Sequence, residues 1–581
     1  MNLPRLSALP RAFDHLRQRL SAPLGIDPAL VIGAARLVLG SRIELVSPVA
    51  LARFTRDLVR RGRHGPSDLV HLQALAQPDG LALVSGAKRF TWRTLDERTH
   101  RLADGLYRLG VRNGDRVGVL LHNTHEHVEC GVALALLGAT SVEIGYRLKA
   151  KEVAYMLADS EARALVFADT HTALVEEVLA ETPSLPREAC VVAGDASPRP
   201  AGFKRFEDVL ATGDAAGPPL AEGESQGGIM VYTSGTTGRP KGADRRIRDT
   251  GFGPILNFIA DLPMRHDERH LVVCPLYHSM AQFFTTIHLA MGCTVLLLDR
   301  FDPELLLSTI ERERITSMTL VPTMWRRLLS IGAPAIRRHD LSSLRWLMSG
   351  SAPLPTELAG RIEDTFGPLL YNFYGATESG VVTLARPGEH TARPGTIGRL
   401  VRGSSVRLLD PDGRPVPEGE VGEIWVSSRM VIGGYFRNAA ATAAASREGF
   451  FSVGDLGRRD ADGYYYLADR KHDMVISGGV NIYPLEIEQR LHAHPAVSDC
   501  AVVGYPDPDW GESLAAFVVL HPGAAATDGD LAAFITAELA DFKRPRRFLF
   551  IDELPRNPTG KVLRRELRER LHQEPAATPS A

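Results

Sequence analysis

Short apolar runs alternate with amphipathic helical patterns along the chain from about residue 70 onward. The run at 81–84 precedes a helical pattern over 91–109, and the run at 116–121 precedes another around 129–137. Strands that alternate with helices favour parallel sheets with helices packed on both faces. We therefore expect an α/β fold whose large N-terminal domain is built from doubly wound sheets.

The alternation changes after residue 400. Residues 405–409 and 421–427 flank the turn sequence Asp-Pro-Asp-Gly, which predicts a small antiparallel element. A shorter α+β unit then begins near Asp469, with helical patterns over 484–492 and 528–541. We expect four parts: a basic amphipathic helical extension (1–70), a large domain (71–468), a smaller mobile α+β domain (469–570) and a disordered tail (571–581).

Bulk composition excludes several functional classes. A chain of 581 residues exceeds what one hydrophobic core supports, so at least two domains are expected. Its 67 basic and 69 acidic residues nearly cancel, so we expect no nucleic-acid partner. Five cysteines without a C-x-x-C pair, and no apolar run of about 18 residues, favour a reducing cytoplasmic location.

Residues 1–63 are strongly basic, with eleven arginines, no lysine and four acids. Apolar stretches between these charges predict amphipathic helices. Such helices either pack as a cap on the main domain or lie at an anionic membrane surface, which would make the protein peripheral on the inner face of the membrane. Both alternatives remain open from the sequence.

The segment YTSGTTGRPKG at 232–242 has the composition of a phosphate-binding loop, and it follows an apolar run at 228–231. Its glycines let backbone N–H groups approach an anion, its hydroxyls add donors, and its lysine adds a positive charge. It is not a Walker A loop, because the order Gly-Lys-Ser/Thr is missing. The expected phosphate-binding residues are Thr233, Ser234, Gly235, Thr236, Thr237, Gly238 and Lys241.

This loop resembles the signature loop of the adenylate-forming superfamily of AMP-binding enzymes, which includes acyl-CoA synthetases, adenylation domains of peptide synthetases and luciferases. Other segments match the family in the same order. They are PLYHS at 275–279, SGSAP at 349–353, YNFYGATES at 371–379, SVGD at 452–455 and PTGK at 558–561. The resemblance covers about residues 75–568 and, overall, points to fatty acyl-CoA synthetases.

The resemblance implies roles for individual residues. Catalytic roles fall to Lys561, Glu378, Thr233 and His278, with Thr233 and Glu378 as ligands of Mg²⁺. The nucleotide is bound by Gly350, Ser351, Ala352, Pro353, Asn372, Tyr374, Gly375, Thr377, Asp455 and Arg470. The thiol channel is faced by Ser477, Gly478 and Gly479.

Electrostatics gives Lys561 a reason to be catalytic. A carboxylate that attacks the α-phosphate of ATP meets a polyanion, and a cation at the attack site offsets that repulsion. Lys561 lies in the expected small domain and the phosphate loop in the large one, so the domains must close for adenylation. The resemblance implies that the small domain then swings about residues 469–473, where His472 replaces the usual Asp or Lys.

The predicted reaction joins a carboxylic acid, ATP and coenzyme A to give acyl-CoA, AMP and pyrophosphate through an acyl adenylate. A medium- or long-chain fatty acid is the expected substrate, although the apolar residues 280–284 and the pair Met324 and Trp325, expected as pocket walls, suit aryl acids as well. Three alternatives are an acyl-AMP ligase that loads a carrier-protein thiol, a CoA ligase for aryl or other carboxylates, and a catalytically silent scaffold.

Overall fold

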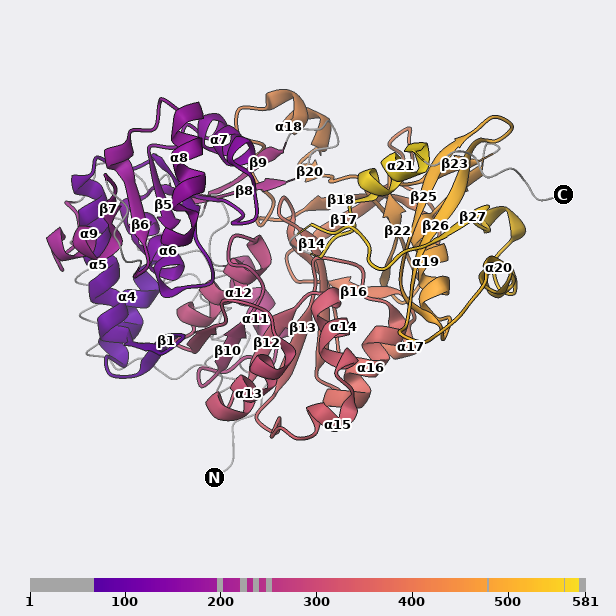
Figure 1. The fold of residues 1–581 in the computed structure, drawn as a ribbon, viewed down its shortest axis with the longest axis horizontal. Helices are drawn as coiled ribbons and strands as arrows, with labels where there is room; N and C mark the ends of the chain where they lie inside the picture. The colour runs from indigo at the N-terminus through magenta and orange to yellow at the C-terminus, as the bar shows by residue number, and fades with distance from the viewer. Residues whose placement is uncertain are drawn as a thin grey trace, which may run out of the picture.

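The computed structural model describes residues 67–195, 202–219, 227–233, 240–246, 253–477, 480–557 and 560–573. The extension over residues 1–63, the loop residues 234–238 and Gly478 and Gly479 lie outside these ranges, so the expectations for them stay predictions. In the described residues the chain forms three sheets, arranged from one side of the molecule to the other in chain order (Figure 1).

The first sheet has seven strands in the order β7-β6-β5-β3-β4-β8-β9. All neighbours are parallel except β8 and β9, which are antiparallel. The strands are β3 (Arg116–Leu120), β4 (Thr140–Glu143), β5 (Ala164–Ala168), β6 (Cys190–Ala193), β7 (Lys204–Arg205), β8 (Gly228–Thr233) and β9 (Lys241–Arg246). The accompanying helices are α4 (Ser67–Ala76), α5 (Trp92–Arg108), α6 (His125–Leu137), α7 (Ala150–Asp159), α8 (Thr172–Glu181) and α9 (Phe206–Thr212).

The second sheet has fifteen strands. Its parallel part contains β1 (Leu81–Ser85), β10 (Arg269–Val272), β11 (Thr294–Leu297), β12 (Ser317–Leu320), β13 (Trp346–Ser349) and β14 (Leu370–Ala376), and β2 (Lys88–Thr91) pairs antiparallel with β1. Its helices are α11 (Gly253–Asp261), α12 (Ser279–Ala290), α13 (Pro303–Glu313), α14 (Pro322–Ser330), α15 (Ala333–Ile336), α16 (Thr356–Phe366) and α17 (Glu389–Ala392). Buried strands covered by helices explain why these runs are apolar throughout rather than alternating.

The same sheet continues as an antiparallel region. It contains β15 (Gly380–Ala385), β16 (Thr396–Leu400), β17 (Ser405–Leu409), β18 (Gly422–Ser427), β19 (Ser446–Arg447), β20 (Phe450–Phe451), β21 (Asp455–Arg459) and β22 (Tyr465–Arg470), with the helix α18 (Ala439–Ala445). Strands β17 and β18 form the predicted hairpin, and Gly413 in the turn has a φ of 81°. The expected domain boundary at 468/469 falls within β22.

The third sheet belongs to the smaller C-terminal unit (orange to yellow in Figure 1). It contains β23 (Val475–Ser477), β24 (Val480–Ile482), β25 (Val497–Asp507), β26 (Gly511–Leu520) and β27 (Arg547–Phe550), with α19 (Pro484–His492), α20 (Asp528–Thr536) and α21 (Arg564–Gln573). The predicted fold class is therefore confirmed. Helix α21 includes the first residues of the expected tail, and 574–581 lie outside the described ranges.

Within the described ranges, no helix is both long and apolar enough to cross a membrane. The expectation of a peripheral membrane contact rests on residues 1–63, which the structure does not describe, and so it stays a prediction.

Candidate functional site

A cavity of about 880 Å³ lies where the two large sheets and the C-terminal unit meet. Residues from β8, β9, α6, α12, β14 and β21 line it, and so does the chain before α21, which reaches from the C-terminal unit toward β14 (Figure 1). Ten of the expected site residues border this one cavity: Thr233, Lys241, His278, Ser351, Gly375, Thr377, Glu378, Asp455, Arg470 and Lys561.

Glu378 lies at the phosphate end of the cavity, in the turn between β14 and β15. The side-chain hydroxyl of Thr233 donates a hydrogen bond to its Oε1 atom at 2.8 Å, and the hydroxyl of Tyr435 donates to the same atom at 3.1 Å. Nζ of Lys241 lies 5.2 Å from the centroid of the Tyr435 ring. The buried carboxylate of Glu378 and the hydroxyl of Thr233 are hard oxygen ligands. With the Lys241 cation nearby, they fit a site that binds Mg²⁺ together with phosphates.

Asp455 begins β21 and is held between two expected site residues. The hydroxyl of Tyr374 donates to its Oδ2 atom at 2.8 Å, and Nε of Arg470 lies 3.3 Å from its Oδ1 atom. Strands β21 and β22 pair Asp455 directly with Arg470, which explains how residues fifteen apart in sequence meet. Tyr374 does not border the cavity, so the stacking on adenine that the resemblance implies stays a prediction.

Lys561 borders the cavity next to a backbone bridge between Arg556 and Val562. The side chain of Asn557 accepts a hydrogen bond from the Lys561 backbone N–H at 2.9 Å. Burial and the neighbouring Arg470 lower the pKa of Lys561, Asp455 and Asp473 oppose that change, and the net pKa is about 8. Lys561 thus loses its proton more readily than an exposed lysine.

His278 precedes α12 and borders the same cavity. Burial lowers its pKa to about 3, so the imidazole is neutral at neutral pH. Its Nε2 atom has no hydrogen-bond partner among the described residues. A neutral imidazole is better suited to line the path of the acyl group or the thiol than to donate a proton.

Other expected residues lie near the cavity without bordering it. Gly350 follows β13, and a Cβ atom there would lie 2.5 Å from the Phe373 ring, so glycine is needed for that ring to pack. Ala352, Pro353, buried Asn372 and Ser477 on β23 are also outside the lining. Of the expected pocket walls, Met280, Gln282 and Phe283 border the cavity, and their contact with the acyl group stays a prediction. Ala281, Phe284, Met324 and Trp325 do not border it, and α14 turns Trp325 into the hydrophobic core.

Several lining residues were not predicted. Tyr435, Arg245, Glu143 and His127 border the cavity, but each comes from a segment without a recognised motif. The guanidinium of Arg245 donates to the backbone oxygens of Thr377 and Met430.

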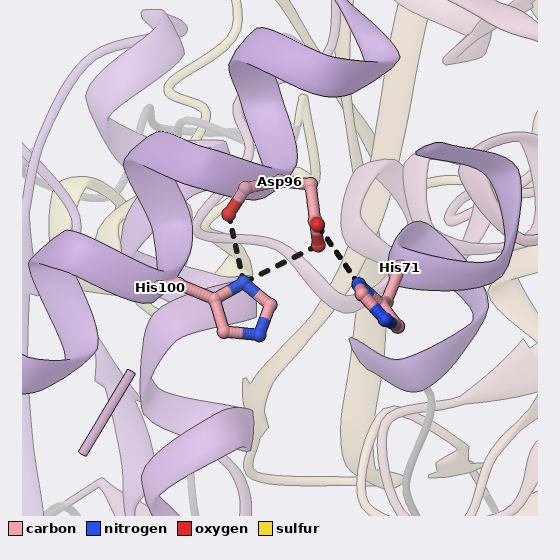
Figure 2. A group of neighbouring side chains, drawn as sticks. All are labelled: His71, Asp96 and His100. Carbon is pink, nitrogen blue, oxygen red and sulfur yellow. Dashed lines mark hydrogen bonds and ion pairs between the residues drawn. The ribbon is translucent and has the colours of Figure 1, made fainter. Parts of the chain in front are cut away.

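A second cluster, of His71, Asp96 and His100, joins α4 to α5 outside the cavity (Figure 2). Nδ1 of His71 lies 2.8 Å from Asp96 Oδ2, and Nδ1 of His100 lies 2.8 Å from the Asp96 backbone oxygen. Because a carbonyl oxygen only accepts, His100 Nδ1 carries a proton and is not free to bind a metal. Burial raises the pKa of Asp96, but hydrogen bonds from both histidines outweigh it and hold that pKa well below its ordinary value. The cluster therefore fits a structural contact that holds α4 against α5.

Comparison with known proteins gives two family matches. The family model described as AMP-binding enzyme matches residues 70–436. The model described as AMP-binding enzyme C-terminal domain matches residues 486–561.

Among similar proteins are CoA ligases for different acids. A feruloyl-CoA synthase of an Amycolatopsis species is 38% identical over 501 residues, which are 86% of this chain and 97% of that protein. The long-chain-fatty-acid–CoA ligase FadD13 of Mycobacterium tuberculosis is 31% identical, over 86% of this chain and 95% of the other. The crystal structure of the anthranilate CoA ligase AuaEII with anthranoyl-AMP superimposes with a TM-score of 0.81 at 29% identity, covering 88% of this chain and 98% of that chain.

Proposed function

Because the chain belongs to the family of AMP-binding enzymes and is an acid–thiol ligase of the AMP-forming type, we propose that it couples an aromatic carboxylic acid to coenzyme A. ATP and CoA are its co-substrates, and the acid reacts through an acyl adenylate. The proposal replaces the fatty acid that the overall resemblance suggested.

The observation that carries this proposal is the mixed polarity of the cavity beyond the nucleotide end. Polar Gln282 on α12, whose Oε1 atom is buried without a hydrogen-bond partner among the described residues, lies among apolar Phe283 and, on α6, Val132. A saturated chain would leave this polar group without a partner, which costs free energy, whereas a substituted aromatic acid offers both a flat apolar ring and polar groups. The similarity to a feruloyl-CoA synthase and to an anthranilate CoA ligase supports the same class.

The other site residues fit the two ends of the adenylate. Lys561 bridges the acid carboxylate and the α-phosphate, where it offsets their repulsion. Glu378 and Thr233 hold Mg²⁺, which would neutralise phosphate charge. Asp455 accepts hydrogen bonds from the ribose hydroxyls, and Arg470 keeps that carboxylate oriented.

A fatty acid is the second candidate, and one specific observation favours it. The far part of the cavity is also bordered by apolar Val70, Ala135, Ile255 and Leu289, which suit a hydrocarbon chain. FadD13, a long-chain-fatty-acid ligase, is 31% identical to this chain.

A substrate panel tests the proposal. Purified protein is given ATP, Mg²⁺ and CoA with cinnamate, 4-hydroxycinnamate, octanoate or palmitate, and acyl-CoA, AMP and pyrophosphate are measured. We expect kcat/KM to be at least about tenfold higher for the aromatic acids, which corresponds to about 1.4 kcal/mol. A higher kcat/KM for either fatty acid contradicts the aromatic class. Adenylate formation that persists in excess EDTA contradicts the role of Mg²⁺.

A further inference from the structure

One face of the first sheet forms the floor of the cavity. In the register of the sheet, Glu143 on β4 pairs with Val231 on β8, which pairs with Ala243 on β9. Residues paired across neighbouring strands point to the same face, and all three border the cavity. Two residues further along β8, Thr233 pairs with Lys241 at the phosphate end.

The register also gives the distance between Glu143 and the phosphate end of the cavity. Strands rise about 3.3 Å per residue, so the row that contains Glu143 lies about 7 Å along the sheet from the row of Thr233 and Lys241. Glu143 on β4 is also one strand away from Thr233 on β8 and two strands away from Lys241 on β9, at about 4.8 Å per strand. An acid whose carboxylate meets the α-phosphate can therefore place its far end near Glu143 when its body lies along the floor.

Glu143 is a buried carboxylate with bonding capacity left over. It is 3% exposed, and two side chains donate to it: His127 from Nε2 at 2.9 Å, and Ser141 from its hydroxyl. Its ion-pair partner is His127, and no arginine or lysine side chain of the described residues forms an ion pair with it. An ionised carboxylate accepts about four hydrogen bonds, so two sites remain. A buried charge of this kind is stabilised by each further donor.

We propose that Glu143 binds the acid directly, by accepting a hydrogen bond from a hydroxyl or N–H group on the end of the acid remote from its carboxylate. His127 and Ser141 are positioning residues that hold Glu143 in the floor. The proposal rests on the proposed function, because it names the group that an aromatic substrate carries.

Charge along the cavity supports this assignment. The cations Lys241, Arg470 and Lys561 border the nucleotide end together with the carboxylates of Glu378 and Asp455. Deeper in the floor, the carboxylate of Glu143 is accompanied only by His127 as an ion-pair partner among the described residues. A carboxylic acid that enters backwards would bring its carboxylate toward Glu143, where like charges repel, and away from the cations that it needs. Glu143 thus selects both the orientation of the acid and a donor at its far end.

Three acids with the same cinnamate skeleton test the proposal. At the 4-position, 4-hydroxycinnamate carries a hydrogen-bond donor, 4-methoxycinnamate carries only an acceptor, and cinnamate carries neither. We expect kcat/KM of the unmodified enzyme to be about tenfold higher for 4-hydroxycinnamate than for the other two, since a hydrogen bond to a charged group is stronger than one between neutral groups. In Glu143→Met the ratio should fall to about one, while cinnamate is still converted. Glu177→Gln, a change of an exposed carboxylate on α8, is the matched control and should keep the ratio.

Glu143→Gln adds a signature that a merely structural role would not give. The amide keeps an acceptor oxygen and gains N–H donors, so activity should shift toward 4-methoxycinnamate. This variant also serves if Glu143→Met does not fold, which a thermal shift with ATP will show.

The outcomes separate the two proposals. Equal kcat/KM for all three acids in the unmodified enzyme, or an unchanged ratio in both Glu143 variants, overturns the role of Glu143 and leaves the aromatic-acid ligase intact. Failure of the unmodified enzyme to convert any of the three acids overturns the aromatic class, and the role of Glu143 with it.

Discussion

The proposed mechanism requires a positively charged Lys561, but the surroundings of this side chain lower its pKa. Burial is the main reason that its pKa lies at about 8, and the neighbouring Arg470 adds to the effect. The protonated form is the one that can bridge two anions in the proposed mechanism. The charge of this side chain should therefore be visible in the pH dependence of the reaction.

We predict that kcat/KM for pyrophosphate release falls as pH rises through about 8, because Lys561 loses its proton there. This parameter reports ionisations of the free enzyme, before ATP stabilises the cation. Lys561→Ala should lower adenylation about 10²–10³-fold, as removal of a group that stabilises developing charge does elsewhere. The measurement is a pyrophosphate assay between pH 6.5 and 9.5.

Lys561→Arg is the informative comparison. It should lower the rate but move the alkaline fall out of the measured range, because a guanidinium keeps its proton. The same alkaline fall in this variant would assign the ionisation to another group.

At the scale of single residues, the sequence predicted the residues at the nucleotide end of the cavity well and those at the acid end poorly. Thr233, Glu378, Asp455, Arg470 and Lys561 stand in recognisable motifs, and all five border the cavity. Glu143 and His127 stand in ordinary strand and helix sequences. These two residues reach the cavity only because of the way the strands pair, and no local sequence pattern specifies strand pairing.

Helix α14 is the surface on which the loop of Lys561 rests. A Cβ atom on Gly560 would lie 2.5 Å from Thr323 Oγ1, and Gly560 has a φ of 79°, so the loop needs glycine for both reasons. Arg326, also on α14, forms an ion pair with Asp499 of β25 at 2.6 Å. Asp499 pairs with Arg556 as well, at 2.6 Å.

We predict that Arg326→Ala slows adenylation about tenfold, because it removes one partner of a largely buried ion pair that holds the C-terminal unit against α14. Transfer from preformed acyl adenylate to CoA should change less than twofold, since the proposed mechanism uses a different orientation for that step. Single-turnover assays of each half-reaction measure both effects.

Arg327→Ala, on the exposed side of the same helix, provides the control and should leave both steps unchanged. Equal losses in the two half-reactions of Arg326→Ala would mean that the ion pair stabilises the protein without favouring one orientation.

Elements with chemical end signals were predicted best. The helix at 484–492 agrees with α19 at both ends, because Pro484 occupies its first turn. The helix expected over 528–541 ends at Thr536 instead. Its alanine-rich sequence continues past that point without a glycine or proline to mark the stop, so the end depends on tertiary packing.

Across the whole molecule, several buried histidines are held neutral. Burial lowers the pKa of His288 and His492 to about 3 and that of His390 to about 4. An unfolded chain takes up protons on these rings near pH 6.5, whereas the folded chain does not. The free energy of unfolding should therefore fall as pH decreases from about 6.5 toward 4.

We predict that His390→Leu stabilises the protein and makes it less sensitive to acid. His390 on α17 is 2% exposed, and neither ring nitrogen has a hydrogen-bond partner in the described part of the chain. Replacing two unsatisfied polar atoms with an apolar side chain should raise the free energy of unfolding by about 1–3 kcal/mol. Thermal unfolding at pH 7.5 and 5.0 should show a larger gain at the lower pH.

Exposed His521 supplies the control, and His521→Leu should change neither value appreciably. A lower melting temperature for His390→Leu at both pH values would show that the ring makes a packing contribution larger than the cost of its unsatisfied nitrogens.

The overall architecture could be predicted because alternation of elements is a property of the whole chain. Strands β1 and β3 and the hairpin of β17 and β18 lie where the sequence predicted them. The long second sheet could not be predicted, since it joins parallel and antiparallel regions through β14 and β15. Pairing between segments separated by long stretches of sequence is decided by burial and not by local propensity.

The floor of the cavity also bears on how an enzyme of this kind acquires a new substrate. Lys241 and Thr233 stand at one end of the β8–β9 pair, and the proposed contacts of the acid lie further along, at Val231, Ala243 and, on neighbouring β4, Glu143. Single changes at the far rows would alter the choice of acid while the nucleotide end keeps its geometry. Selection in a laboratory could therefore diversify Glu143, Gln282 and Thr286 together and still recover libraries rich in active adenylating enzymes.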